Sequence, residues 1–127
     1  DLDHFKSIND GFGHEVGDQV LARVGQLLVD LVRNADSAIR WGGEEFVILA
    51  PRTRLPDAVA LADRVRVGLG QHTHAVVGHI TASLGVAEHE PGDTRKSLVK
   101  RADEALYAAK AAGRNCVRSF PDALQGN

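Results

Sequence analysis

Two adjacent glycines at positions 42 and 43 constrain the fold of this chain more than any other feature of its sequence. They lie between an extended run at residues 37–40 and an apolar run at residues 46–50. Glycine reaches the positive φ angles that tight turns require, so the sequence predicts a β-hairpin with a short turn. Glu44 and Glu45 are then expected on opposite faces at the start of the second strand. Such a tip suits a metal-bound polyphosphate, although a plain hairpin with a charged tip shows the same pattern.

Composition limits the classes of protein that need be considered. The chain has 127 residues, 43% apolar and 25% charged, which fits one globular domain with a buried core. Its net charge of -2 argues against binding to nucleic acid, which would normally require a basic face. The single cysteine, Cys116, rules out an internal disulfide and fits a reducing cytoplasm. No apolar run approaches the roughly 20 residues that span a bilayer, so we expect no direct membrane contact from this segment.

Apolar residues recur at the spacing of an amphipathic helix in three segments. The first helix is expected to begin after Gly17, and Asp18 near its start is by itself explained as a helix cap. The second helix follows a connection at residues 51–56. The third is expected to end at Gly113, because glycine commonly takes the left-handed position after a helix.

The first ten residues concentrate acidic and polar side chains around three apolar ones. This pattern predicts the end of a strand that turns into a loop, and an Asx-rich turn at Asn9 and Asp10 explains it equally well. We therefore expect a domain at residues 1–120 that lacks its N-terminal helix and most of its first strand, followed by a C-terminal tail at residues 121–127. Residues 79–87 predict a further strand, and residues 115–120 can add a short edge strand.

With the first strand supplied, the order of elements becomes β-α-β-β-α-β followed by α-β. This order is typical of an α+β ferredoxin-like palm, in which helices flank a mostly antiparallel central sheet, as in nucleotidyl cyclases. The first strand would lie beside the hairpin, so Asp1 and Glu44 could share one Mg²⁺. Few and hard oxygen ligands suit Mg²⁺ that is bound to a nucleoside triphosphate.

The sequence resembles the GGDEF domain, the diguanylate cyclase family that converts two GTP molecules into cyclic di-GMP. The signature stands here in its GGEEF variant at residues 42–46, and the resemblance extends from Asp1 to about Phe120. The supporting motifs are DLDHFKSIND at residues 1–10, GHEVGD at 13–18, SLG at 83–85 and ADEALYAAKAAGRN at 102–115.

The resemblance implies a catalytic centre. Asp1, Glu44 and the Leu2 carbonyl would ligate Mg²⁺ or Mn²⁺, whereas Glu45 would bind a second metal or help to activate the ribose hydroxyl. Arg40 resembles the family's phosphate-facing arginine beside the signature. The residues implied in substrate binding are His4, Phe5, Lys6, Asn9, Asp18, Gly42, Gly43, Lys110 and Arg114.

Within this set, Asn9 and Asp18 would recognise guanine. A carboxylate accepts hydrogen bonds from guanine N1–H and the 2-amino group, whereas adenine presents an acceptor at N1, so GTP is expected to be preferred over ATP. The backbone N–H groups of His4 and Phe5, with Lys6 and the two cations at the end of the last helix, would hold the phosphates.

The resemblance also implies assembly and control. Each domain would present one nucleotide, so catalysis would require a homodimer with two-fold symmetry. Arg33 and Asp36 match the RxxD site at which cyclic di-GMP inhibits the family, and Arg64 matches an arginine that often completes it. Spacing alone favours an ordinary polar end of a helix at residues 33–36.

Two other classes of function are alternatives to the cyclase. An inactive GGDEF module that senses cyclic di-GMP or GTP would share the fold, although the intact signature argues against it. A ferredoxin-like RNA binder would need an aromatic-rich sheet face, which 5% aromatic residues do not supply. The expected location is the cytoplasm, alone or as the cytoplasmic part of a larger sensor or membrane protein.

Overall fold

Helices and short strands alternate along residues 1–121, the part of the chain that the computed structural model describes. The elements are α1 Phe5–Phe12, α2 His14–Leu31, β1 Ser37–Gly42, β2 Glu45–Leu49, α3 Leu55–Gln71, β3 Leu84–Val86, α4 Arg95–Ala111 and β4 Val117–Ser119. The expected α+β class is confirmed. The expected tail at residues 121–127 lies, apart from Pro121, outside the described residues.

The hairpin is confirmed, but its turn lies one residue later than expected. β1 pairs antiparallel with β2 and places Gly42 opposite Glu45, so Gly43 and Glu44 form the turn. Gly43 adopts the left-handed φ of 51° that such a turn requires. The register shifts at Trp41, which is typical of a β-bulge, and this extra residue moves the turn along the chain. Glu44 therefore belongs to the turn, and only Glu45 begins the second strand.

A helix follows Asp1 where a loop was expected. Leu2 forms an isolated antiparallel bridge with Ala82, and α1 then begins at Phe5. Phe5 and Ile8 are both buried and lie three residues apart, so they share the face of α1 that packs against α2. Burial of these side chains outweighs the weak helix propensity of the polar residues that follow them.

The second helix begins earlier than its apolar pattern indicated. α2 starts at His14, with Gly13 at its N-cap, so Asp18 lies one turn inside the helix and does not cap it. The capping explanation for Asp18 is therefore wrong. The predicted apolar stripe is confirmed, because Val20, Val24 and Leu28 are all buried.

The strands form two separate pairs in place of one continuous sheet. β1 and β2 are antiparallel, whereas β3 and β4 are parallel, with Leu84 opposite Val117. The chain before β3 also pairs with the first residues, since Asp1 and Ser83 exchange two backbone hydrogen bonds of 2.9 and 3.0 Å. A groove of about 790 Å³ lies between β2 and β3. Within residues 1–121 no strand joins the two pairs across this groove.

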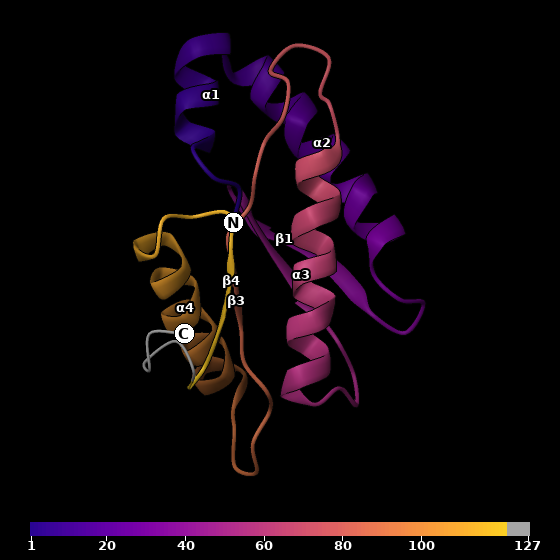
Figure 1. Ribbon diagram of the computed structural model, residues 1–127, viewed down its shortest axis with the longest axis vertical. Coiled ribbons are helices and arrows are strands. Elements are labelled where there is room, and N and C mark those ends of the chain that lie inside the picture. The colour runs from indigo at the N-terminus through magenta and orange to yellow at the C-terminus, as the bar shows by residue number, and fades with distance from the viewer. Residues whose placement is uncertain (122–127) are drawn as a thin grey trace.

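The helices pack on both sides of β3 and β4. Figure 1 shows α4 on one side of this pair and α3, with α2 behind it, on the other. α4 approaches β3 so closely that a Cβ on Gly85 would come within 2.2 Å of the Ala102 carbonyl oxygen. The helix begins with a capping box at Thr94 and is followed by Gly113 with φ 114°, which confirms the predicted C′ glycine. None of the helices in the described residues combines the length and the apolar character that crossing a bilayer requires.

Candidate active site at the start of the chain

Asp1 and Lys110 form an ion pair that joins the segment before α1 to the last turn of α4. The Asp1 side chain is only 5% exposed, and its Oδ2 atom contacts the Lys110 ammonium. Its Oδ1 atom is buried and has no hydrogen-bond partner among the described residues. A buried carboxylate oxygen without a donor is unfavourable, so Asp1 presents an acceptor that suits a hard cation.

The hairpin glutamates lie within electrostatic range of Asp1. The Lys110 ammonium and the carboxylates of Asp3, Glu45 and Glu44 all lie close enough to the backbone nitrogen of Asp1 to act on it electrostatically. Residues from the two ends of the described chain and from the hairpin therefore share one charged region.

The donor set in this region is incomplete for a metal on its own. No group of three His, Cys, Asp or Glu side chains within residues 1–121 is arranged to hold an ion. The expected set has only two carboxylates, Asp1 and Glu44, with the Leu2 carbonyl. This chemistry fits Mg²⁺, which commonly takes one or two carboxylates and completes its shell with substrate phosphates and water.

The hairpin tip presents its polar groups to solvent. Arg40 is exposed, and its Nε donates a 3.0 Å hydrogen bond to the Gly43 carbonyl oxygen. Glu45 is exposed and Glu44 half-buried, while a Cβ at Gly42 or Gly43 would meet nothing within 4 Å. The tip is therefore open, with the guanidinium held against the turn.

The start of α1 is suited to an anion. His4 occupies the N-cap in the left-handed region with φ 58°, and no side chain caps the helix. The first backbone N–H groups of a helix lack intrahelical acceptors and lie at the positive end of its dipole. Lys6 is exposed in the first turn, so the predicted phosphate-binding residues His4, Phe5 and Lys6 are adjacent on this helix end.

Asn9 lies against the residue before Asp18, where α1 packs on α2. A Cβ on Gly17 would come within 2.0 Å of Asn9 Oδ1, so the Asn9 side chain lies directly against the residue before Asp18. Asn9 is half-buried and Asp18 is exposed. An amide beside a carboxylate offers the donor and acceptors that a guanine edge requires.

Lys110 and Arg114 lie at the other boundary of the site. Lys110 belongs to the last turn of α4, and Arg114 is exposed in the turn that follows, with φ 65°. The neighbouring Asn115 donates its backbone N–H to the buried carboxylate of Asp3 at 3.0 Å. Sequence reasoning did not single out Asp3, because a bond between residues 3 and 115 leaves no local pattern.

The predicted inhibitory residues form a second polar group. Arg33 donates from Nε and Nη2 to the two carboxylate oxygens of Asp36, each at 2.8 Å, and from Nη2 to Thr53 Oγ1 at 2.7 Å. The bond to Arg33 lowers the pKa of Asp36, and the charge of Arg64 contributes to the same shift. Arg64 also donates to the Leu31 carbonyl oxygen at the end of α2.

The structure brings Arg33, Asp36 and Arg64 together, and it adds Thr53, which the sequence did not predict. Asp36 lies just before β1 and the hairpin tip lies just after it. The six residues of β1 therefore separate the group of Arg33, Asp36 and Arg64 from the polar residues of the hairpin tip. At about 3.3 Å per residue, this corresponds to roughly 20 Å.

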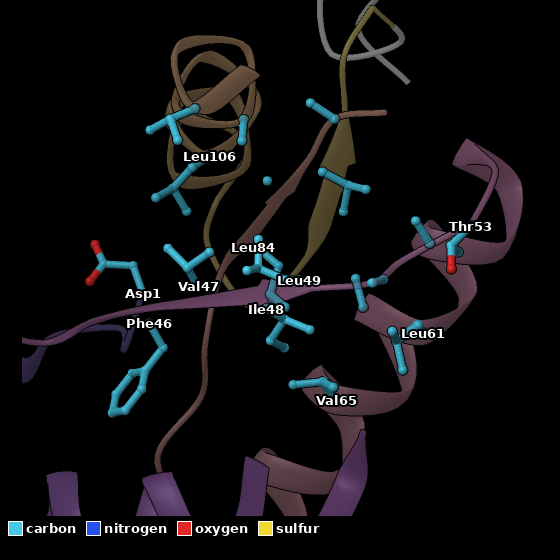
Figure 2. A pocket seen from close by; sticks show the side chains of 18 of the residues that line it. Asp1, Phe46, Val47, Ile48, Leu49, Thr53, Leu61, Val65, Leu84 and Leu106 are labelled. Atoms are coloured by element: carbon cyan, nitrogen blue, oxygen red, sulfur yellow. The ribbon is translucent and has the colours of Figure 1, made fainter. Parts of the chain in front are cut away.

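The groove between β2 and β3 is apolar and adjoins Asp1. Figure 2 shows Val47 of β2 pointing toward Leu106 of α4, while Phe46 points to the opposite side of the strand. Leu61 and Val65 of α3 and Leu84 of β3 also line this space. Such a lining does not suit a charged nucleotide, so the groove and the polar site are distinct in character.

Comparison with known proteins agrees with this arrangement. Residues 1–116 match the family model described as "Diguanylate cyclase, GGDEF domain". Diguanylate cyclase DgcM of Escherichia coli K12 is 46% identical over 117 residues, which cover 92% of this chain and 28% of the relative. Response regulator PleD of Caulobacter vibrioides is 46% identical over 123 residues, which cover 92% of this chain and 27% of the relative. The chain thus spans less than a third of the length of these relatives.

Solved structures show the same fold. Diguanylate cyclase SiaD of Pseudomonas aeruginosa, in complex with its activator SiaC, matches with a TM-score of 0.89 and 42% identity, covering 94% of this chain and 47% of that one. The active GGEEF domain of a diguanylate cyclase from Vibrio cholerae matches with a TM-score of 0.86 and 35% identity, covering 94% of this chain and 78% of that one. The matched residues contain the hairpin, both ends of the polar site and all four helices of the described residues, and so the chain belongs to the diguanylate cyclase GGDEF-domain family.

Proposed function

We propose that this domain condenses two GTP molecules into cyclic di-GMP and releases pyrophosphate. The observation that supports this most strongly is the arrangement at Asp1, where one carboxylate oxygen contacts Lys110 and the other is buried without a partner. Glu44 and Glu45 lie within electrostatic range of the same residue. The relatives DgcM and SiaD, which are named diguanylate cyclases, support the same activity.

In this proposal Asp1, Glu44 and the Leu2 carbonyl hold Mg²⁺ or Mn²⁺, which supplies positive charge to the triphosphate when bound. Glu45, exposed at the start of β2, takes part in activating the ribose hydroxyl or in holding a second ion. The 3′-oxygen of each nucleotide attacks the α-phosphorus of the other, the bond from each α-phosphorus to its bridging oxygen breaks, and two pyrophosphates leave while the two hydroxyl protons pass to the solvent.

Cations and N–H groups of the chain stabilise the charge that grows on the phosphates during this step. Lys110 and Arg114 act from the end of α4, and Arg40 from the hairpin. The start of α1 contributes the N–H groups of His4 and Phe5, together with Lys6, while Gly42 and Gly43 let the phosphates approach the backbone. Asn9 and Asp18 select guanine.

Each domain binds one GTP in this mechanism, so two copies must face each other for the 3′-oxygen of one nucleotide to reach the phosphorus of the other. Cyclic di-GMP, the ligand solved with the related DgcB of Caulobacter crescentus, is proposed to bind at Arg33, Asp36 and Arg64 and to inhibit turnover. The domain acts in the cytoplasm, where GTP is available.

We also propose that the polypeptide preceding Asp1 fills the apolar groove as a strand. Asp1 and Leu2 already pair antiparallel with Ser83 and Ala82, so extending this strand backward leads along β3 into the groove. Such a strand would join β2 to β3 and complete the mostly antiparallel central sheet of a ferredoxin-like palm. Residues 1–120 are then the part of the GGEEF-variant domain that follows its N-terminal helix and most of its first strand.

The decisive experiment is to incubate the full-length protein with GTP and Mg²⁺ and to measure pyrophosphate and cyclic di-GMP. Glu44→Gln should abolish both products and leave the unfolding temperature unchanged, because Glu44 lies in the hairpin turn and outside the core. Glu104→Gln, an exposed carboxylate of α4, serves as the matched control and should retain activity. Full activity of Glu44→Gln would contradict the proposal, and GTP binding by the parent without product would indicate a sensor.

A further inference from the structure

Asp3 has three hydrogen bonds that the proposed chemistry does not use. Its side chain is buried, and its carboxylate accepts from Thr81 Oγ1 at 2.7 Å, from Ser83 Oγ at 2.6 Å and from the Asn115 backbone N–H at 3.0 Å. Its own N–H donates to the Thr81 carbonyl oxygen at 2.9 Å. Asp3 is therefore fixed to the segment before β3 and reaches from there to the turn after α4.

That turn has an unusual backbone. Gly113, Arg114 and Asn115 are left-handed in succession, with φ angles of 114°, 65° and 47°. Asn adopts this region more readily than other residues with a Cβ, so the conformational cost falls mainly on Arg114. Asn115 is held on two sides, since its N–H donates to Asp3 and its Oδ1 accepts from Arg66 Nη1 at 3.0 Å.

The turn carries Arg114, one of the two cations proposed to bind phosphate, and the other, Lys110, lies just before it in α4. Arg114 is the residue directly before Asn115, and its own N–H donates to Ala109 of α4 at 3.1 Å. Lys110, one turn earlier, contacts Asp1, which lies two residues from Asp3. The segment at residues 1–3 thus meets the end of α4 twice, once through Asp1 and once through Asp3.

We propose that Asp3 is a positioning residue for phosphate binding. By accepting the Asn115 N–H it holds the left-handed turn, and with it Arg114 and the end of α4, at a fixed place relative to Asp1. It acts through Asn115 and touches no substrate. The identity of the ligand, a triphosphate or pyrophosphate, rests on the proposed function. The hydrogen bond by which Asp3 fixes the turn does not depend on that function.

A matched pair of variants isolates this bond. Thr81→Val with Ser83→Ala removes the two hydroxyl partners of Asp3 and leaves its bond to Asn115. Adding Asp3→Ala removes the bond to Asn115 as well. Because the hydroxyl groups of Thr81 and Ser83 are already absent, the triple variant does not pay for a buried hydroxyl without a partner. The double and the triple variant then differ in the contact to Asn115.

Two quantities are measured on the full-length protein. The first is hydrogen exchange of the Asn115 amide without nucleotide, with the amides of Val24 and Leu28 in the core of α2 as the reference for an intact fold. The second is the dissociation constant for pyrophosphate and for GTP with Mg²⁺. Asp3→Asn in the parent serves as the rescue variant, since its amide oxygen can accept from Thr81 and Asn115 while its NH₂ donates to Ser83.

In the triple variant the Asn115 amide should exchange roughly tenfold faster than in the double variant, and pyrophosphate and GTP should bind roughly five- to tenfold more weakly. Asp3→Asn should remain within about threefold of the parent, whereas the double variant, in which Asp3 Oδ1 loses the Ser83 donor, is compared only with the triple variant, with the core amides of α2 as the reference for the fold. Equal Asn115 exchange in the double and triple variants overturns the inference, as does faster exchange with unchanged affinity. A parent that binds neither pyrophosphate nor GTP contradicts the proposed function. In that case the exchange rate of the Asn115 amide in the double and triple variants still tests whether Asp3 holds the turn.

Discussion

The Asn9 side chain lies so close to Gly17 that a Cβ at position 17 would come within 2.0 Å of Asn9 Oδ1. Glycine at this position lets α1 approach α2 and leaves room for the Asn9 side chain against the residue before Asp18. The same Cβ would lie 3.1 Å from Phe5 Cζ, so the space is closed on both sides. The contact between the two helices therefore also determines the geometry of the proposed guanine site.

Gly17→Ala should weaken GTP binding more than it weakens the fold. The added methyl group displaces the Asn9 side chain, while overpacking of about 1–3 kcal/mol is offset by a gain of about 1 kcal/mol in helix propensity. We expect at least a roughly tenfold higher dissociation constant for GTP, measured by calorimetry. Gly25→Ala is the control, because a Cβ there meets nothing within 4 Å on the same helix. Equal GTP affinity in both variants would exclude Asn9 from guanine recognition.

A strand in the apolar groove should protect the Gly85 amide. Leu84 donates to Cys116 and Val86 accepts from Phe120, so these two residues direct their backbone groups toward β4. Successive residues of a strand direct these groups to opposite sides, and Gly85 therefore faces the groove. In the full-length protein its amide should exchange at least roughly tenfold more slowly than in residues 1–127 alone.

Hydrogen exchange followed by NMR measures this difference directly. The Leu84 amide, which donates to Cys116 at 3.0 Å, is the internal control and should be protected in both proteins. Unchanged exchange at Gly85 alongside protected Leu84 would show that the polypeptide before Asp1 does not pair with β3.

The ion pair between Asp93 and Arg101 at the start of α4 should make the free energy of unfolding depend on pH in the acidic range. Asp93 accepts from Arg101 Nη1 and Nη2 at 2.6 Å and from Ser97 Oγ at 2.7 Å. The Arg101 bonds, with those of the Glu90 N–H and Ser97, hold the pKa of Asp93 far below its ordinary value of 3.8. Because the folded-state pKa is lowered, this stabilisation is complete above the ordinary pKa and declines as pH falls below it.

Asp93→Asn should therefore reduce the free energy of unfolding at about pH 6, with a difference from the parent that shrinks as pH approaches about 2. Urea unfolding across this range measures the effect. Asp103→Asn, an exposed aspartate on the same helix, is the control and should follow the parent at each pH. If the difference in unfolding free energy between Asp93→Asn and the parent stays constant with pH, the charge of Asp93 does not contribute to stability.

Local patterns predicted most elements of this fold, and tertiary contacts explain the exceptions. The apolar stripe of α2 could be predicted because it repeats every one or two helical turns. The glycine after α4 could be predicted because the end of a helix is a local signal. α1 was missed because its polar residues favour a turn, and only burial of Phe5 and Ile8 against α2 makes it helical. The division of the sheet was not visible, since pairing between strands depends on residues far apart in the chain.

The candidate site divides in the same way. Motif residues such as Arg33 and Asp36 are three apart, a spacing that puts them within reach of each other, and the structure shows their bidentate contact. Thr53 and Asp3 contact residues 20 and 112 positions away, so nothing near them in the sequence indicates their role.

The last prediction concerns inhibition by product at Arg33. The guanidinium is held by Asp36 and by Thr53, so it is oriented before any ligand binds. Arg33→Ala removes a charge-assisted contact to cyclic di-GMP and should weaken product binding roughly ten- to hundredfold. Thr53→Val removes only one hydrogen bond to Arg33 and should weaken it roughly two- to fivefold.

Progress curves at saturating GTP distinguish this site from the active site. The parent should slow as cyclic di-GMP accumulates, whereas Arg33→Ala should continue until GTP is consumed, because a product bound before β1 restrains the domain without occupying the hairpin. Initial rates should stay within about twofold of the parent, since Arg33 lies at the far end of β1 from Glu44. Arg23→Ala, an exposed arginine of α2 that bonds Gln26, is the control and should be inhibited like the parent. If added cyclic di-GMP inhibits the parent and Arg33→Ala at the same half-maximal concentration, residues 33–36 are an ordinary helix end and inhibition arises at the active site.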